Sequence, residues 1–194
     1  MDLGELMKGC RSLTDQEIED VFGVLTTKRD KLLFLLGIKT GLRISELLSL
    51  QIKDVIQHGE VGNWVTVQKK NTKGKIESKT LPLTDRIRQV LKEYLDTVPN
   101  REHELPLFKS TKGRTAITRM QAHRILKAAF NELKMTGNLS THSCRKSFAK
   151  RVHTAMGEKI EYTQVALCHR SLSSTASYVQ VNQETVVKAI LGMG

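Results

Sequence analysis

The sequence contains little cysteine, and its few cysteines form no pattern. The three, Cys10, Cys144 and Cys168, lie far apart, and no pair has the C-x-x-C spacing. An odd and scattered set of this kind argues against a disulfide framework and against a cysteine-type zinc site. We therefore expect a protein of a reducing compartment.

Long apolar runs are also missing. No stretch approaches the roughly 18 residues that a membrane-spanning helix needs. The first residues, MDLGELMKGC, lack the pattern of a signal peptide, and the chain contains no internal repeat or low-complexity tract. We therefore expect a soluble, intracellular protein that does not act at a membrane.

Acidic residues are the minority among the charged ones. Lys and Arg number 31 against 20 Asp and Glu, which gives a formal net charge of +11. This excess favours a polyanionic partner, because contacts to phosphate release counterions and so contribute affinity. A solvated basic surface is the alternative, but we favour nucleic acid. The 194 residues, 39% of them hydrophobic, are enough for one domain with its own core.

Hydrophobic periodicity predicts that most of the chain is helical. Thr14, followed three residues later by Glu17, forms a capping box and predicts a helix start. The segment from Leu32 to Ile38 is apolar almost all round, as in a buried helix, and Thr40-Gly41 ends it. Further helices are predicted at 42–50 and at about 85–96, 118–135, 141–156, 160–168, 173–180 and 183–191, with an irregular loop at 98–114.

Between about residues 54 and 83 the pattern changes to that of strands. Trp64–Val67 and Lys79–Leu83 flank the turn sequence Asn71-Thr72-Lys73-Gly74 and predict a β-hairpin. Val55-Ile56 is a candidate third strand. The fold class is therefore α+β, mainly α-helical, with a small three-stranded antiparallel sheet.

Arg145 occupies an unusual place in the predicted helix 141–156. At about 100° per residue it falls inside an apolar arc. A guanidinium cannot shed its charge, so its burial requires an anion from a carboxylate or from a ligand. His142, three residues earlier, lies at the edge of the same arc and can face the same pocket. A structural ion pair with Glu46 or Asp54 is the alternative. The apolar arc consists of Cys144, Phe148, Ala149, Val152, Ala155 and Met156.

A histidine and a tyrosine stand out near the end of the chain, where His169 precedes Tyr178 by nine residues. On the predicted helix around Tyr178, the buried stripe consists of Leu172, Ala176 and Val179, and Tyr178 lies about 120° away from it. Tyr178 is therefore expected outside the core. By itself, His169 has the ordinary interpretation of a histidine at a helix end.

Four segments together resemble the tyrosine recombinase family, the phage-type integrases and their relatives. The segment 40–47, TGLRISEL, resembles the box of the first catalytic arginine, here Arg43, which Glu46 would support. Residues 72–75, TKGK, resemble the loop of the catalytic lysine. Residues 142–145, HSCR, match H-x-x-R, and 167–169, LCH, with Tyr178 resemble the L-G-H box and its nucleophile. Order and spacing agree with the family over about residues 12–182.

The chain departs from the family pattern at two cysteines. Cys144 stands where the family usually has leucine, and Cys168 where it usually has glycine. Both side chains are small, but Cys168 leaves the turn before His169 less free than glycine would.

Five lysines crowd one hairpin, so the resemblance leaves more than one candidate for the catalytic lysine. Lys73 is preferred, ahead of Lys75 and Lys70. Most of the others are expected to be solvated side chains that seek phosphate. The hairpin lysines are Lys69, Lys70, Lys73, Lys75 and Lys79.

The resemblance implies an enzyme that breaks and rejoins DNA through a 3′-phosphotyrosyl intermediate, with no metal and no cofactor. The implied catalytic residues are Arg43, Lys73, His142, Arg145, His169 and Tyr178, supported by Glu46. The DNA-binding candidates are Lys69, Lys70, Lys75, Lys146 and Arg170.

The resemblance also implies an organisation and partners. Residues 1–11 would be an N-terminal extension or linker, 12–182 the catalytic domain, and 183–194 a C-terminal tail helix. Exchange of this tail between protomers and packing in cis both stay open, and no N-terminal core-binding domain is expected. Double-stranded DNA is the implied partner, with a tetrameric synapse on it and accessory DNA-bending proteins. The expected setting is the nucleoid, in the cytoplasm of a bacterium, an archaeon or a phage-infected host cell.

Three other functions are alternatives to this one. An enzyme related to type IB topoisomerases or to telomere resolvases would use the same residues but rejoin DNA differently. A non-catalytic DNA-binding regulator or excision accessory factor would have no need for the whole set of implied catalytic residues. A helical interaction module would leave Arg145 unexplained.

Overall fold

The computed structural model describes residues 9–72, 77–99, 102–111, 113–168 and 175. The chain divides into two compact units, Met1–Phe148 and Ala149–Gly194. The boundary between them lies inside a helix, α6, which spans Thr141–Ala155. The predicted catalytic domain 12–182 therefore includes residues of both units.

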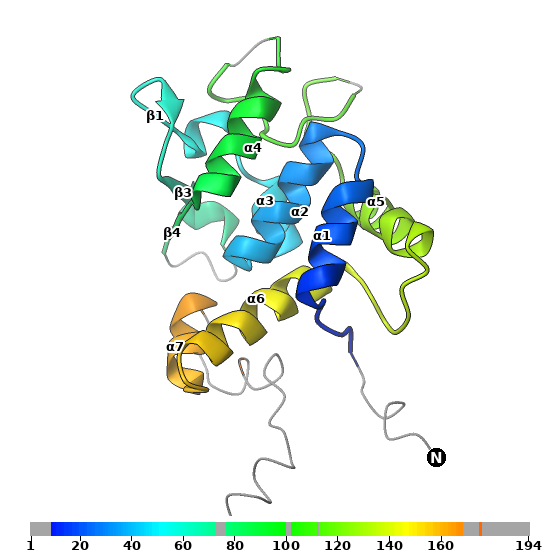
Figure 1. The fold of residues 1–194 in the computed structure, drawn as a ribbon. Helices are drawn as coiled ribbons and strands as arrows, with labels where there is room; N and C mark the ends of the chain where they lie inside the picture. Colours follow the sequence, from blue (N-terminus) through cyan, green and yellow to red (C-terminus); the bar gives the residue numbers. More distant parts are fainter. Residues whose placement is uncertain (1–8, 73–76, 100–101, 112, 169–174, 176–194) are drawn as a thin grey trace, which may run out of the picture. The chain divides into compact units, whose positions relative to one another are not determined.

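Helices are the main regular elements of the first unit (Figure 1). They are α1 (Asp15–Val24), α2 (Lys28–Thr40), α3 (Ile44–Leu48), α4 (Asp85–Leu95), α5 (Arg119–Glu132) and the first half of α6, with short 3-10 helices η1 (Ile52–Asp54) and η2 (Lys69–Asn71). Each helix predicted between residues 15 and 156 is confirmed, with its ends displaced by a few residues at most. The capping box of α1 is present, since Thr14 accepts from the N–H of Glu17 and Glu17 accepts from that of Thr14.

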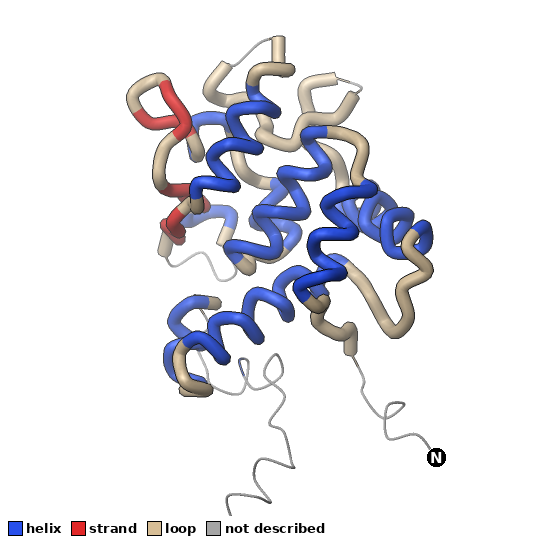
Figure 2. Tube along the Cα trace, viewed as in Figure 1, coloured by secondary structure: helices blue, strands red, loops and turns tan. Residues whose placement is uncertain are grey.

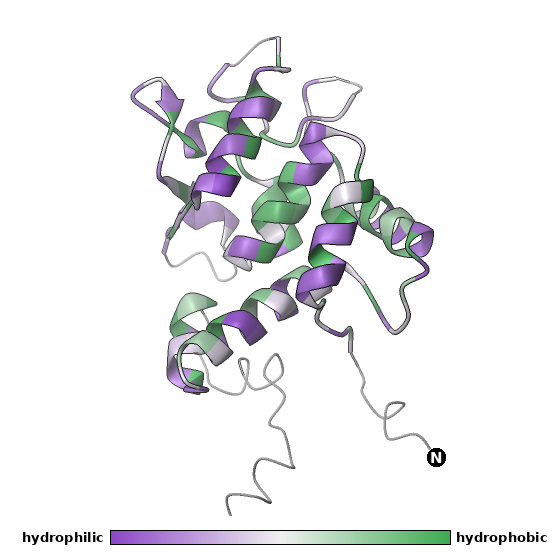
Figure 3. Ribbon diagram, in the orientation of Figure 1, coloured by the Kyte–Doolittle hydropathy of each residue, from purple (hydrophilic) through white to green (hydrophobic). Residues whose placement is uncertain are grey.

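The helix α2 lies at the centre of the first unit and contacts α1, α3 and α4. Figure 3 shows its middle turns as strongly apolar. Leu32 and Leu36 face one group of buried side chains, which includes those of α4 and β3. Phe34 and Ile38 face a second group, which includes those of α1 and α5. Because both faces are covered, the middle of α2, from Leu32 to Ile38, is apolar almost all round.

The strands form two small sheets instead of the predicted one (Figure 2). β1 (Ile56–Gln57) pairs with β2 (Glu60–Val61), and β3 (Trp64–Val67) pairs with β4 (Lys79–Pro82), both antiparallel. The hairpin predicted from the flanking strands is confirmed, but the single three-stranded sheet is wrong. The part of the turn that covers residues 73–76 lies outside the described residues.

A tight turn explains why the predicted third strand pairs locally. His58 and Gly59 have positive φ angles of 52° and 83°. Two successive residues with positive φ form the turn type that closes a two-residue hairpin. Ile56 is thereby folded back onto Val61, its partner in the register. Ile56 therefore pairs within its own hairpin and does not add a third strand to Trp64–Val67.

The segment between α4 and α5 is irregular, as predicted for residues 98–114. Its described residues form no helix and no strand, only isolated bridges from Pro106 to Gln51 and from Lys109 to Ala116. The hydroxyl of Tyr94 donates to the carbonyl oxygen of Leu107 at 2.8 Å, which fastens this loop to α4.

In the second unit, α7 (Ile160–Ala166) follows the end of α6 and confirms the helix predicted at 160–168. Thr163 is fully buried, and its hydroxyl lies 3.3 Å from Nδ1 of His153. The helices predicted at 173–180 and 183–191 lie outside the described residues, except for Thr175. Among the helices that are described, none is long and apolar enough to span a bilayer.

Gly41 ends α2 in a conformation that other residues adopt at a cost. Its φ is 61°, and it forms the C-cap of the helix. A Cβ built on it would lie 2.3 Å from Cδ1 of Phe148 on α6. Backbone conformation and close packing therefore both require glycine here.

We predict that Gly41→Ala destabilises the protein by about 2–4 kcal/mol, since it adds left-handed strain to overpacking against Phe148. Urea unfolding followed by circular dichroism measures this. Gly23→Ala in α1 is the matched control, because Gly23 is helical and its added Cβ would meet nothing within 4 Å. Equal stability of the two variants would contradict the packing argument.

Candidate active site

The turn between α2 and α3 sets the position of Arg43. The hydroxyl of Thr40 donates to the carbonyl oxygen of Leu36 at 2.6 Å and accepts from the N–H of Leu42 at 3.4 Å. Gly41 then reverses the chain, and Arg43 becomes the N-cap residue of α3. The backbone of Arg43 is thus fixed by local bonds encoded in the sequence TGLR.

Glu46 holds Arg43 from one turn further along α3. Its Oε2 accepts from the backbone N–H of Arg43 at 2.8 Å, and its Oε1 accepts from the guanidinium at 3.2 Å. The Glu46 side chain is only 1% exposed, whereas that of Arg43 is 22% exposed. A guanidinium has five N–H donors, so Arg43 can be oriented by Glu46 and still donate to a ligand.

A second cation reaches the same carboxylate from β4. The ammonium of Lys79 lies 2.5 Å from Oε1 of Glu46, and the Lys79 side chain is 10% exposed. Lys79 is therefore an exception to the expectation that most hairpin lysines are solvated. The strand register carried a usable signal, since Lys79 alternates with Thr80 and falls on the same face as Leu81.

These contacts set the protonation of Glu46. Burial acts to raise the pKa of its carboxyl, but the hydrogen bonds from Lys79 and from the backbone of Arg43, together with both positive charges, outweigh burial. The pKa of Glu46 therefore lies below its ordinary value, and the group stays ionised at neutral pH. Removing the cations would leave a buried charge uncompensated, at a cost of about 3–5 kcal/mol.

Arg145 is buried in α6, with 2% exposure, at the place where an apolar side chain was the ordinary choice. Its guanidinium donates a hydrogen bond to the carbonyl oxygen of Gly41. Because Gly41 lies two residues before Arg43 in the same turn, this bond brings α6 to the segment that carries the first arginine. The two predicted arginines are thus brought together by one glycine. The candidate alternative partner Asp54 accepts instead from Gln51 and Gln68, both at 2.8 Å.

His142, one turn before Arg145, is exposed. Partial desolvation, followed by the positive charges of Arg145 and Arg43, lowers the pKa of His142. The neutral imidazole is therefore favoured at neutral pH, and it can accept or donate a hydrogen bond.

The predicted DNA-binding lysines are described only in part. Lys69 and Lys70 are exposed in η2 and line a groove of about 700 Å³ with Lys53. Lys146 is half-buried on α6. The predicted residues that lie outside the described part of the chain are Lys73, Lys75, His169, Arg170 and Tyr178.

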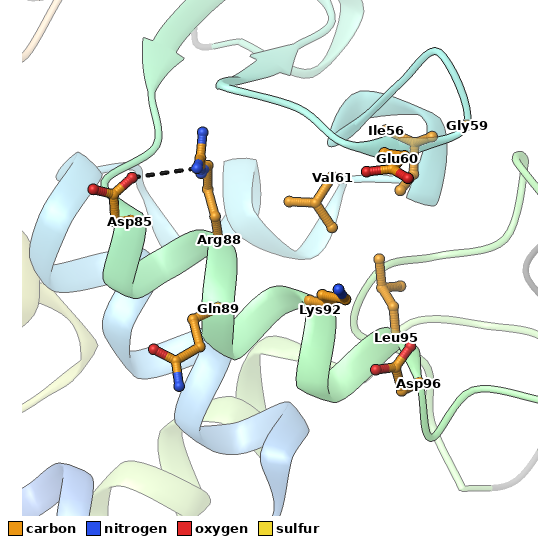
Figure 4. A pocket seen from close by; sticks show the side chains of 10 residues that line it. All are labelled: Ile56, Gly59, Glu60, Val61, Asp85, Arg88, Gln89, Lys92, Leu95 and Asp96. Atoms are coloured by element: carbon orange, nitrogen blue, oxygen red, sulfur yellow. Dashed lines mark ion pairs between the residues drawn. The ribbon is translucent and has the colours of Figure 1, made fainter.

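A second groove, of about 690 Å³, lies between the β1–β2 hairpin and α4 (Figure 4). Both acidic and basic side chains line it, and Arg88 pairs with Asp85 at 3.3 Å. Its lining includes none of Arg43, His142 and Arg145. In the part of the chain that is described, no group of three or more His, Cys, Asp or Glu side chains could hold a metal ion.

The two cysteines that depart from the family pattern have different surroundings. Burial raises the pKa of the Cys144 thiol to about 12. A Cβ built on Gly37 would lie 3.2 Å from the Cβ of Cys144, so α2 and α6 are in close contact there. Cys168 is exposed, and its φ of 51° lies in the region that favours glycine.

Residues 11–185 match the family model described as the Phage integrase family. The chain belongs to the phage integrase family. It is 32% identical over 182 residues to the probable integrase/recombinase YoeC of Bacillus subtilis, with 93% of each chain covered. It is 30% identical over 160 residues to the tyrosine recombinase XerC of Pelobacter propionicus, which covers 82% of this chain and 50% of that protein. The predicted resemblance of the chain to this family is thereby confirmed.

Solved structures of phage integrase relatives share the fold. The XerA recombinase has a TM-score of 0.75 at 19% identity, over 94% of this chain and 63% of that one. The XerH site-specific recombinase, bound to a palindromic difH substrate in a post-cleavage complex, has a TM-score of 0.73 at 22% identity, over 98% of this chain and 55% of that one. The predicted fold class, α+β and mainly α-helical, is confirmed, apart from the single three-stranded sheet. The chain spans only part of the length of these Xer proteins.

For this integrase-family chain we predict that Cys168→Gly is at least as stable as the parent, whereas Cys168→Val is less stable by about 1–2 kcal/mol. Glycine tolerates the positive φ, but a β-branched residue does not. Because Cys168 is exposed, neither change removes core packing. Hydrogen exchange of the α7 amides reports local stability, and faster exchange in the glycine variant than in the valine variant would refute the prediction.

Proposed function

We propose that the chain contains the catalytic domain of a site-specific DNA recombinase that cuts and rejoins DNA through a 3′-phosphotyrosyl intermediate. The observation that carries the proposal is the convergence of two arginines from distant parts of the sequence. Arg145 donates to Gly41, and Arg43 follows two residues later with its guanidinium held by Glu46. Family membership over residues 11–185 supports the same activity.

The proposed reaction is a balanced exchange of phosphodiester bonds. The phenol oxygen of Tyr178 attacks phosphorus and loses its proton, while the bond from phosphorus to the 5′-oxygen breaks. The 5′-oxygen takes up a proton and leaves as a hydroxyl group. A 5′-hydroxyl of another strand then attacks the phosphotyrosyl bond, which releases Tyr178 and restores the DNA backbone.

The roles of the other residues follow from their charges. Arg43 and Arg145 would offset the negative charge that grows on the non-bridging phosphate oxygens, for which a fixed guanidinium is better suited than a flexible ammonium. Lys73 would protonate the leaving oxygen. His142, favoured in its neutral form, and His169 would orient the phosphate or assist proton movement.

Double-stranded DNA is the proposed partner. Crystal structures with the same fold include XerH bound to difH substrate and a lambda integrase dimer bound to a COC′ core site. The net charge of +11 and the exposed lysines of η2 favour the same partner. We further propose that the protein forms a tetrameric synapse on DNA and acts in the nucleoid. Residues 183–194 would form the C-terminal tail helix of each protomer.

We predict that Tyr178→Phe binds DNA normally but forms no covalent adduct, because phenylalanine has no nucleophilic oxygen. The probe is a library of duplex oligonucleotides with a randomised centre and a nick placed near it. A short fragment released beyond the cleavage point diffuses away, which traps the covalent complex. Adducts are then separated on denaturing gels and sequenced.

The control for this experiment is the parent chain on the same library. An adduct with the parent and none with the variant supports the proposal, while equal adduct levels would reject Tyr178 as the nucleophile. Relaxation of a plasmid without the selected sequence would favour the topoisomerase-like alternative. DNA binding without any adduct from the parent would favour the non-catalytic regulator.

Arg145→Lys is predicted to lose at least about 100-fold in the rate of adduct formation, which corresponds to about 2.7 kcal/mol of transition-state stabilisation. The planar guanidinium can donate to Gly41 and to a phosphate at once. Lysine keeps the positive charge but has only a single ammonium group. Single-turnover rates at saturating DNA measure this loss. Cleavage near the parent rate would show that guanidinium geometry is not needed.

A further inference from the structure

Lys79 is turned inward at the start of β4. Along this strand Lys79 and Leu81 are half-buried, while Thr80 and Pro82 are exposed. Its partner across the hairpin is Val67 on β3, which is fully buried. A lysine so covered normally has a charged partner, because an unpaired ammonium is costly to remove from water.

The partner of Lys79 is Glu46, which also holds Arg43. Lys79 and the guanidinium of Arg43 share one oxygen, Oε1 of Glu46, at 2.5 Å and 3.2 Å. The other oxygen accepts from the backbone N–H of Arg43 at 2.8 Å. A single buried carboxylate therefore joins β4 to the turn that carries the first arginine.

The charges of this group do not cancel. Arg43 and Glu46 alone would sum to zero, and a carboxylate beside a guanidinium weakens its attraction for phosphate. Lys79 adds a second positive charge, so two cations and one anion leave a net charge of +1. The exposed fractions of Arg43, Lys79 and Glu46 are 22%, 10% and 1%, so Arg43 is the member that a ligand can reach most easily.

We propose that Lys79 is a positioning residue of the active site: it neutralises Glu46, so that Arg43 is held by this carboxylate yet keeps its positive charge for the scissile phosphate. This inference rests on the proposed function. Lys79 acts through Glu46 and Arg43, and it does not itself donate to the reacting phosphate.

The main experiment measures single-turnover adduct formation on a nicked duplex selected with the parent chain. Lys79→Met is expected to lower the rate at saturating DNA by about 10–100-fold with little change in the concentration needed for half-saturation, because the loss falls on charge developing in the transition state. Lys79→Arg is expected to restore the rate to within a few-fold. Lys92→Met, an exposed lysine of α4, is the control for losing one positive charge.

A double variant tests whether Lys79 acts through Glu46. In Glu46→Gln with Lys79→Met, the carboxylate that competes for Arg43 is gone, and glutamine can still accept from the guanidinium. This variant is expected to be faster than Lys79→Met alone, because no buried charge is left unpaired. The inference is wrong if the rate losses of the two single variants multiply in the double variant. It is also wrong if Lys79→Met forms adduct at the same rate as Lys92→Met.

A modified substrate separates positioning from proton donation. With sulfur in place of the bridging 5′-oxygen, the leaving group departs as a thiolate and needs no proton. Lys79→Met is expected to stay slow on this substrate, whereas Lys73→Met is expected to recover. Recovery of Lys79→Met would overturn the inference, since Lys79 would then be the proton donor.

The link between Lys79 and Glu46 can also be tested by a measurement without DNA. This test remains valid even if the parent chain forms no adduct, a result that would reject the proposed function itself. The pKa of Glu46 lies below its ordinary 4.5, so its stabilising contribution is present above that pH and is lost as the pH falls through the lowered value. The stability difference between the parent and Lys79→Met should therefore be large near about pH 7 and shrink toward about pH 4. A difference independent of pH would refute the link.

Discussion

The hydrogen bond from Arg145 to the carbonyl oxygen of Gly41 is the constraint on which the site depends. A guanidinium keeps its charge when buried, so its partners must be built into the fold. The left-handed conformation of Gly41 ends α2, and its missing side chain lets Phe148 of α6 approach. Gly41 thus ends α2, allows α6 to pack closely and accepts the hydrogen bond from Arg145. Arg43 follows it by two positions.

Glu46 has the complementary role on the other side of this turn. It caps α3 by accepting from the backbone of Arg43, orients the guanidinium and receives Lys79 from β4. A carboxylate buried to this degree is stable only with such partners. Electrostatic catalysis of phosphoryl transfer needs cations that are fixed before the substrate arrives. A network of buried charges with few open donors is one way to fix them.

The helices could be predicted from sequence because their signals are local. A capping box at Thr14, an apolar run from Leu32 and a glycine at position 41 each act within a few residues. The sheet was predicted less well, since Val55-Ile56 carries a strand pattern that does not say which strand it will join. The two positive φ angles at His58 and Gly59 decided the pairing, and these are set by the turn itself.

Sequence by itself determined the helical class, the excess of positive charge and the resemblance to a family to which the chain belongs. It could also place Arg145 in an apolar arc, because that follows from helical geometry alone. Only the tertiary structure decided which groups meet: Arg145 with Gly41, and Lys79 with Glu46, across 104 and 33 residues of chain. Lysines in one hairpin look alike in sequence. Among the described ones, the environments differ because the strand register turns Lys79 inward beside the carboxylate of Glu46, while Lys69 and Lys70 are exposed.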